Sequence, residues 1–349
     1  MKIELIGKPQ VVMSNPDSRH GYFAWPTAKR LQDGRIMVGA SGFRVEHVCP
    51  FGKAVVSYSS DEGKTYTLPA PVIDTPLDDR DAGICTFGEK GVIVTSFNNT
   101  AEFQRTNNTD NEYVQRYIDT ITAEDEEKYL GSLFRISNDC GITFGGLHHS
   151  PVTCPHGPVE LRDDTILWAG NRFDDFEGGI EIVSLNPQTC ETEFVGKITL
   201  DDKSIFLNEP YLLEMPDGKL ICHIRAENDT VFTTYQSVSH DKGKTWTYPE
   251  RLLEEDGGAP PHLLLLDSGV LLCTYSRRKQ PYGIMAMLST DGGESWDTDY
   301  RIYENTGSDD LGYPTTVQLN DGTLLTVFYA TDRDGIPCNI LQQKWKLVF

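Results

Sequence analysis

The chain has 349 residues, of which 38% are apolar, and its 52 acidic side chains outnumber 31 basic ones to give a formal net charge of −21. This charge argues against nucleic acid or an anionic membrane surface as a partner. No stretch approaches the roughly 20 apolar residues of a membrane span, and residues 1–14 lack the apolar run of a signal peptide. We therefore expect a soluble cytoplasmic protein, or a secreted one if a leader has been removed.

Strand and turn patterns follow one another along the whole chain. Residues 2–12 alternate as in a strand, and six later segments each contain an apolar strand, a tight turn and a second apolar strand. Aspartate followed by glycine between apolar runs is a strong hairpin signal. The six turns are Asp33-Gly34, residues 89–91, Asp163-Asp164, Asp217-Gly218, Ser268-Gly269 and Asp321-Gly322.

The spacing of these turns predicts the fold. Steps of about 50 to 75 residues suit a four-stranded antiparallel blade with its loops. We predict an all-β protein, a six-bladed β-propeller in which residues 339–345 form the third strand of the last blade. Residues 2–12 would add the outer strand of that blade and close the ring without a free edge.

A short phrase that occurs four times supports this fold. In its pattern, S-x-D-x-G-x-T-W or Asp box, the Asp accepts hydrogen bonds from backbone N–H groups, the Gly supplies a positive φ and the aromatic side chain packs beneath the turn. The copies are residues 59–66 (SSDEGKTY), 137–144 (SNDCGITF), 239–246 (SHDKGKTW) and 289–296 (STDGGESW). In the third blade, residues 184–189 take the place of the Asp box.

We predict a single domain over residues 1–349, with one insertion at about residues 98–128 in the second blade. The insertion contains an Asn-rich stretch and then an acidic run at residues 124–127, which is typical of a solvated excursion. Its aromatic residues suit a lid or the wall of a sugar subsite. An oligomer contact is equally consistent with them, and the oligomeric state stays open.

The cysteines and histidines indicate no metal centre. The eight cysteines are scattered without a C-x-x-C pair, which favours reduced, mostly buried thiols over a disulfide set or a zinc site. His47, His156 and His262 lie on separate predicted blades and lack the close spacing of zinc ligands. We predict neither a catalytic metal nor a cofactor.

Arginine recurs at the end of the second strand of several blades. Strand ends at one repeat position lie on one face of a propeller, so these guanidinium groups are expected to converge near the axis. Such planar forks bind carboxylates and other anions. The arginines are Arg44, Arg172, Arg225, Arg277, Arg278 and Arg333.

The starts of the innermost strands carry polar or aromatic residues next to Pro or Gly. Equivalent positions on six rigid blades face one shared mouth, and packing alone does not explain such residues there. The segments are residues 23–26 (FAWP), 79–83 (DRDAG), 155–158 (PHGP), 208–210 (NEP), 260–262 (PPH) and 312–314 (GYP).

These motifs together resemble the sialidase (neuraminidase) superfamily over nearly the whole chain. The resemblance rests on the Asp boxes, the N-E-P segment before the strand that ends in Arg225, the arginine pair before an Asp box and the G-Y segment before the last turn. It implies a retaining hydrolase in which Tyr313 is the nucleophile and Glu209 its base. It also implies that Arg225 and either Arg277 or Arg278 hold the carboxylate of the substrate.

The chemistry of these residue types agrees with that assignment. A phenol is a poor nucleophile unless a carboxylate takes its proton and cations stabilise its anion, so Tyr313, Glu209 and the arginines form a coherent set. The structural alternative is that Tyr313 stacks in the channel while Glu209 and Arg225 form an ion pair that only holds the fold.

Two positions depart from the pattern of the family. Ala24 stands where the first arginine would be, although Arg44 or Arg80 could substitute from a neighbouring position. The loop of residues 44–52 contains no aspartate to act as the acid, so His47 or Glu46 is the candidate proton donor. The structural alternative for His47 is a hydrogen bond to a backbone carbonyl.

Other candidates lie at the same repeat position. Asp79, Arg80 and Asp81 open the second inner strand, where they would bind the sugar or form a structural ion-pair network. His156 and His262 take the matching place on blades three and five. Each could be structural, but the two together favour contact with the substrate.

We hypothesise a sialidase-like exo-glycoside hydrolase that cleaves a terminal sugar, expected to be acidic, with His47 protonating the leaving oxygen. Its partner would then be an anionic carbohydrate. One alternative is a polysaccharide lyase that acts on a uronic acid, in which Tyr313 or a histidine takes the C5 proton. Another is a carbohydrate-binding propeller without turnover.

Overall fold

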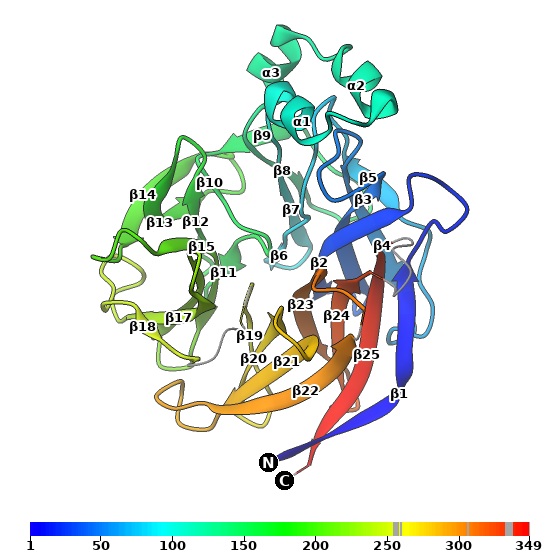
Figure 1. Cartoon of the computed structure of the whole chain (residues 1–349). Helices are drawn as coiled ribbons and strands as arrows, with labels where there is room; N and C mark the ends of the chain where they lie inside the picture. Colours follow the sequence, from blue (N-terminus) through cyan, green and yellow to red (C-terminus); the bar gives the residue numbers. More distant parts are fainter. Residues whose placement is uncertain (254–257, 259, 306, 332–337, 349) are drawn as a thin grey trace.

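The computed structural model describes residues 1–253, 258, 260–305, 307–331 and 338–348. Over these residues, six antiparallel sheets stand as blades around a central axis (Figure 1). Each of the six predicted turns joins the innermost strand of a blade to the next strand outward. The predicted all-β, six-bladed propeller is therefore confirmed.

The first three blades are built from residues 22–198. The strands of blade one are β2 (Tyr22–Arg30), β3 (Ile36–Arg44), β4 (Lys53–Ser59) and β5 (Ala70–Ile73). Those of blade two are β6 (Ile84–Phe87), β7 (Gly91–Phe97), β8 (Ser132–Ser137) and β9 (Leu147–Ser150). Those of blade three are β10 (Val152–Thr153), β11 (Val159–Glu160), β12 (Ile166–Arg172), β13 (Asp175–Leu185) and β14 (Thr192–Ile198).

The last three blades complete the ring. The strands of blade four are β15 (Phe206–Glu214), β16 (Leu220–Glu227), β17 (Phe232–Ser239) and β18 (Glu250–Arg251). Those of blade five are β19 (His262–Leu265), β20 (Leu271–Arg277), β21 (Tyr282–Ser289) and β22 (Asp297–Asn305). Those of blade six are β23 (Leu311–Gln318), β24 (Leu324–Ala330), β25 (Asn339–Val348) and β1 (Lys2–Met13).

The two ends of the chain close the ring in blade six. Strand β1 pairs antiparallel with β25, beginning with Lys2 opposite Val348, and β25 is the third strand of the sheet. Figure 1 accordingly shows the two termini side by side. The amino-terminal strand thus covers the edge that β25 would otherwise expose, as predicted.

The Asp boxes have the predicted geometry. In the first copy, Oδ1 of Asp61 accepts hydrogen bonds from the backbone N–H groups of Lys64 and Thr65 at 3.0 and 2.9 Å, and Gly63 has φ +71°. In blade three Asn186 replaces the aspartate, because its Oδ1 accepts from the N–H groups of Gln188 and Thr189.

Blade three departs from the regular pattern in its innermost strand. That strand is divided into β10 and β11, which both pair with β12, and Gly157 lies between them with φ +79°. A Cβ atom on Gly83 of blade two would lie 2.4 Å from the backbone nitrogen of Gly157. Glycine is therefore required where these two blades approach one another.

Apolar side chains are buried between neighbouring blades and hold them in fixed positions. Phe23 and Val38 of blade one pack with Val327, Tyr329 and other buried residues of blade six in one cluster. All eight cysteines are free thiols, and seven of them are buried. Packing on both sides of each blade makes the inner strands a rigid frame for the residues near the axis.

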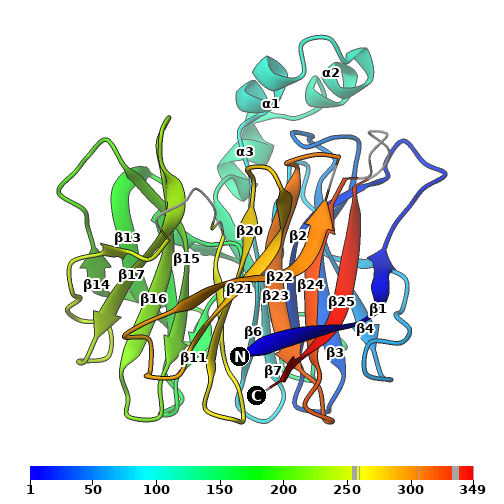
Figure 2. The ribbon, with the colours of Figure 1, turned by 60° about the horizontal axis from the view of Figure 1, so that its bottom comes forward.

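The insertion in blade two contains three short helices, α1 (Ala101–Asn107), α2 (Glu112–Ile118) and α3 (Ala123–Tyr129), which the sequence analysis did not foresee. Thr100, Asn111 and Thr122 cap their amino termini. The helices project from one face of the propeller (Figure 2). None of the helices in the described ranges is both long and apolar enough to cross a membrane.

The insertion rests on loops of blade one. Nε2 of Gln104 donates a hydrogen bond to Asp78 at 2.8 Å, and the hydroxyl of Tyr117 donates to the carbonyl of Pro76 at 3.1 Å. The ring of Tyr113 stacks on Phe51 with 5.1 Å between centroids. Only part of this segment is therefore the solvated excursion that the sequence suggested.

Candidate active site

A strained backbone position recurs at the start of the innermost strands. Trp25, Asp81, Glu209 and Tyr313 have φ values of 54°, 57°, 46° and 52°. The pairing register shifts next to Trp25, Glu209 and Tyr313, which marks β-bulges. A bulge re-aims a side chain, and left-handed positions cost of order 1–3 kcal/mol each. Such repeated strain points to a functional arrangement of these four side chains.

Tyr313 and Glu209 meet across the axis. The Tyr313 hydroxyl donates a short hydrogen bond to Oε1 of Glu209, and Tyr313 is only 6% exposed. Burial, followed by the negative charge of Glu209, raises the pKa of Tyr313 well above its ordinary value, although Arg225 and Arg278 oppose this. The resting phenol is therefore protonated, with a carboxylate in place to accept its proton.

Arg225 holds the other oxygen of Glu209. Its Nη1 donates to Oε2 of Glu209 at 2.7 Å, and its Nη2 donates to Oε2 of Glu227 at 2.6 Å. Nδ2 of Asn208 donates to the other oxygen of Glu227 at 2.7 Å. Burial disfavours the charge of Arg225, but Glu209, Tyr313 and Glu227 outweigh it and raise its pKa. Arg225 thus orients Glu209 and is already paired with two carboxylates.

Arg278 lies beside Tyr313. The Arg278 guanidinium is 5.9 Å from the centroid of the Tyr313 ring, and it donates to the carbonyl of Leu311 and the hydroxyl of Tyr329, each at 3.1 Å. Among the described residues, no carboxylate forms an ion pair with it. Arg277 ends β20, where it pairs in register with Gly283.

His47 lies at the edge of the cluster and is oriented by two groups. Its Nδ1 is 2.9 Å from the hydroxyl of Tyr22 and 3.3 Å from Oδ1 of Asp310, while Tyr22 donates to Oδ2 of Asp310 at 2.8 Å. Burial raises the pKa of Asp310, but the hydrogen bonds from His47, Tyr22 and Tyr329 outweigh it and lower the pKa. With Nδ1 engaged, Nε2 is the atom of the 48% exposed ring that can exchange a proton with a ligand.

Arg44 and Arg80 stand next to the position of the missing arginine. Their guanidiniums lie 4.8 and 4.0 Å from the centroid of the Trp25 ring. Arg44 is fully buried in an ion pair with Asp78, whereas Arg80 keeps slight exposure and contacts the same carboxylate at 3.3 Å. Both donate to the carbonyl of His47, at 2.9 and 3.0 Å. They therefore fix the His47 loop.

The two aspartates of the second inner strand have different surroundings. Asp79 is fully buried, where it accepts hydrogen bonds from the backbone N–H and the hydroxyl of Thr75 at 2.6 and 2.9 Å. Asp81 is 6% exposed and lies close enough to Arg80 and Glu209 to sense their charges. Burial raises the pKa of each aspartate to about 7. Asp81 is thus a carboxyl group in the cluster that can carry a proton near neutral pH.

His156 lies beside Tyr313, and His262 lies beside His156. The His156 ring is 6.4 Å from the Tyr313 ring and 5.6 Å from the His262 ring, and both histidines are buried. Burial lowers the pKa of His156 to about 3 and that of His262 well below its ordinary value. These neutral rings are buried near Tyr313, and their contact with a substrate stays a prediction.

Two further candidates are paired with residues outside this cluster. Arg172 ends β12 and pairs with Asp174 and Glu181. Glu46 accepts a hydrogen bond from Asn111 of the insertion at 3.1 Å. Arg333 lies outside the described residues. Within the described part of the chain, no group of three or more His, Cys, Asp or Glu side chains could hold a metal ion.

Several residues of the cluster were missed by the sequence analysis. Glu227 lies two residues after Arg225 on β16, so the period of two in a strand could have placed both on one face. Asp310 stands three residues before Tyr313 in blade six, as Asp78 stands three residues before Asp81 in blade two. Tyr22 and Tyr329 carry no comparable signal in the sequence.

Comparison with known proteins supports this fold. Residues 157–326 match the BNR repeat-like domain. No curated protein sequence matches the chain. A protein of unknown function from Dyadobacter fermentans has a similar structure, with TM-score 0.79 and 19% identity over 99% of both chains.

Two similar structures belong to enzymes that act on sugars. The NanB sialidase from Streptococcus pneumoniae has TM-score 0.69 and 14% identity over 98% of this chain and 71% of its own. The alpha-L-arabinanase of Penicillium chrysogenum, in complex with arabinobiose, has TM-score 0.64 and 13% identity over 96% of this chain and 97% of its own. The chain is thus a six-bladed β-propeller that is similar in fold to these proteins and matches the BNR repeat-like domain over residues 157–326.

Proposed function

We propose that the protein is a retaining exo-glycoside hydrolase in which Tyr313 is the nucleophile and Glu209 its base. The hydrogen bond from the Tyr313 hydroxyl to Glu209, formed between two strained inner-strand positions, is the observation that carries the proposal. A phenol with a raised pKa needs such an acceptor to attack. Arg225 holds the acceptor in place, and Arg278 lies close enough to stabilise the phenolate.

The reaction proceeds in two displacements. Tyr313 Oη attacks the anomeric carbon while Glu209 takes the phenol proton, and the glycosidic C–O bond breaks as a general acid protonates the leaving oxygen. Water then attacks the anomeric carbon of the glycosyl-tyrosine and gives a proton to the conjugate base of that acid. Tyr313 leaves and recovers its proton from Glu209, so the configuration is retained.

His47 and Asp81 are the two candidates for the general acid. His47 has an orienting carboxylate, Asp310, and an Nε2 atom that can deliver a proton when the ring is cationic. Burial and, to a smaller degree, the charge of Glu209 raise the pKa of Asp81 to about 7, which leaves it partly protonated near neutrality. His47 would donate its proton from a cationic ring and Asp81 from a neutral carboxyl group, so the choice between them can be measured.

The charge of the cluster limits the substrate. Arg225 is matched by Glu209 and Glu227, and the position of the first arginine is Ala24. Arg278 is a guanidinium near Tyr313 that pairs with no carboxylate among the described residues. One such cation suits a terminal sugar with a single anionic group. A sialic acid held by three arginines is a poorer match for these residues.

A screen of aryl glycosides, including acidic and deoxy sugars, tests the function directly. Hydrolysis in ¹⁸O-labelled water should place the label on the anomeric carbon, whereas an unsaturated product would indicate the lyase alternative. Tyr313→Phe and Glu209→Gln should each lower kcat by about 10³-fold or more while the protein still binds the sugar. Tyr58→Phe, which removes a hydroxyl bonded to the carbonyl of Gly141, is the matched control and should retain activity.

If no glycoside is consumed while carbohydrate binding is unaffected by Tyr313→Phe and Glu209→Gln, the protein is a binding propeller and the proposal is wrong. Inverted stereochemistry of the released sugar would also contradict it, because a covalent intermediate requires retention.

A further inference from the structure

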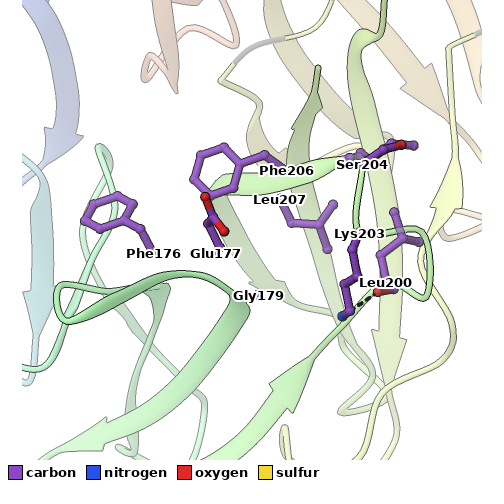
Figure 3. A pocket seen from close by; sticks show the side chains of 9 residues that line it. Phe176, Glu177, Gly179, Leu200, Lys203, Ser204, Phe206 and Leu207 are labelled. Carbon is purple, nitrogen blue, oxygen red and sulfur yellow. Dashed lines mark hydrogen bonds between the residues drawn. The ribbon is translucent and has the colours of Figure 1, made fainter. Parts of the chain in front are cut away.

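A cavity of about 360 Å³ lies between blades three and four, beside the central cluster. Phe176 and Glu177 near the start of β13 form one wall, and the segment from Lys203 to Phe206 forms the other. Figure 3 shows these side chains around the cavity, with Nζ of Lys203 bonded to the carbonyl of Leu200 at 2.8 Å. No residue of this cavity belongs to the site described above.

The cavity and the central cluster share strand β15. Phe206 and Leu207 line the cavity, while Asn208 and Glu209 follow directly in the cluster. Phe206 pairs in register with Glu227, which binds Arg225. At about 3.3 Å per residue, Phe206 is about 10 Å along the strand from Glu209. A substrate that extends beyond one sugar ring can therefore reach both places.

The walls of the cavity are fixed by one buried side chain. Nδ2 of Asn171, which is 2% exposed near the end of β12, donates to the carbonyl of Phe176 at 3.0 Å and to the carbonyl of Leu207 at 2.7 Å. One amide thus joins the two walls. The cavity is therefore a preformed feature of the fold, as ligand sites commonly are.

The lining of the cavity has the chemistry of a sugar site. The rings of Phe176 and Phe206 line it with 6.5 Å between their centroids, and Phe176 is 37% exposed. Phe173, outside the lining, continues this row at 6.3 Å from Phe176. Aromatic faces pack against the apolar face of a pyranose, and a few polar groups set orientation. Glu177 can accept hydrogen bonds from hydroxyl groups, and Lys203 can donate them.

We propose that this cavity binds the leaving-group sugar of the substrate, the residue joined to the terminal sugar through the glycosidic oxygen. The inference rests on the proposed function, because it takes Glu209 and Tyr313 as the place where the bond is cut. It adds that the enzyme selects an oligosaccharide with a carbohydrate leaving group over a glycoside with a small one.

Kinetics on two substrates with the same terminal sugar test the proposal. For Phe176→Ala, kcat/KM is expected to fall about tenfold or more on a disaccharide but less than about threefold on the methyl glycoside. Phe194→Ala is the matched control, because Phe194 is 65% exposed on β14 of the same blade and lies outside the cavity. Equal losses on both substrates, or no loss on either, would overturn the assignment.

A binding measurement separates this proposal from the proposed function. Arabinobiose, lactose and maltotriose are titrated calorimetrically into the protein and into its Phe176→Ala and Glu177→Gln variants, with thermal unfolding as a check on folding. Binding of at least one probe that Phe176→Ala weakens about tenfold supports a sugar site here even if no glycoside is hydrolysed. Binding that is insensitive to both variants, or no binding of any probe, contradicts it.

Discussion

Glu209 and Arg225, on the adjacent strands β15 and β16, form an ion pair of 2.7 Å, and the remaining oxygen of Glu209 accepts a hydrogen bond from Tyr313. One carboxylate thereby links blade four to blade six across the axis. Because Arg225 also binds Glu227, its charge is balanced before any ligand arrives. The cluster is therefore arranged to hold Glu209 as the proton acceptor and also to bind the anionic group of a ligand.

This balance predicts the effect of Glu227→Gln. The substitution keeps the size of the side chain but removes the charge of one of the two carboxylates that pair with Arg225. Arg225 therefore becomes more available to an anionic sugar. The inhibition constant of glucuronate is expected to fall by roughly three- to tenfold, while that of glucose stays unchanged. Competition assays with both sugars measure this. Equal changes for glucose and glucuronate would contradict the role assigned to Arg225.

The pH dependence of the rate identifies the general acid. A general acid must be protonated, so the rate falls as the pH rises through its pKa. If Asp81 is the acid, the fall of the rate near pH 7 reports its raised pKa. Asp81→Asn then lowers kcat by about 10²-fold or more and removes that fall. His47→Gln would then change kcat much less. The reverse outcome for the two variants would assign the role to His47.

Stability should depend on pH through Asp79, which burial gives a pKa of about 7 against an ordinary value of 3.8. The folded state binds the proton more tightly than the unfolded state, so this contribution is full below about pH 4 and is lost as the pH rises through about 7. The shift corresponds to at most roughly 4 kcal/mol. Asp79→Asn should flatten the pH dependence of the unfolding free energy between pH 4 and 8, measured by denaturant titration; an unchanged slope would refute this.

The helical insertion is predicted to stabilise the loop that carries His47. Gln104 reaches from α1 to Asp78, the buried partner of Arg44. Gln104→Ala leaves that carboxylate with one donor fewer and should lower the free energy of unfolding by about 1–3 kcal/mol. Glu102→Ala, in the same helix, is the exposed control. If both variants unfold alike, the contact of Gln104 contributes nothing measurable.

The fold could be predicted from the sequence because its signals are local. Each Asp box makes its hydrogen bonds within seven or eight consecutive residues, and each hairpin turn is set by two or three. The order of the blades then followed from spacing alone. The helices of the insertion were missed because their caps, such as Thr122 with Asp125, lie in a polar sequence without an obvious apolar stripe.

The site was predictable only in part. Tyr313, Glu209, Arg225 and Arg278 share a repeat position or a motif, and the structure brings them together. The sequence carries no signal for how deep a residue lies along the propeller axis. It therefore did not distinguish the buried His156 and His262 from residues at the surface of the mouth. The pairing of Asp310 with His47 joins blades one and six and depends on contacts remote in the chain.

The most direct test of the central claim is to trap the covalent intermediate. The protein is incubated with a panel of fluorinated glycosyl fluorides, whose second displacement is slow, and is then digested and analysed by mass spectrometry. The account predicts one glycosyl group attached to the peptide that contains Tyr313, and none in Tyr313→Phe. Turnover of the same sugars with the label on another residue, or with an inverted product and no adduct, would contradict it.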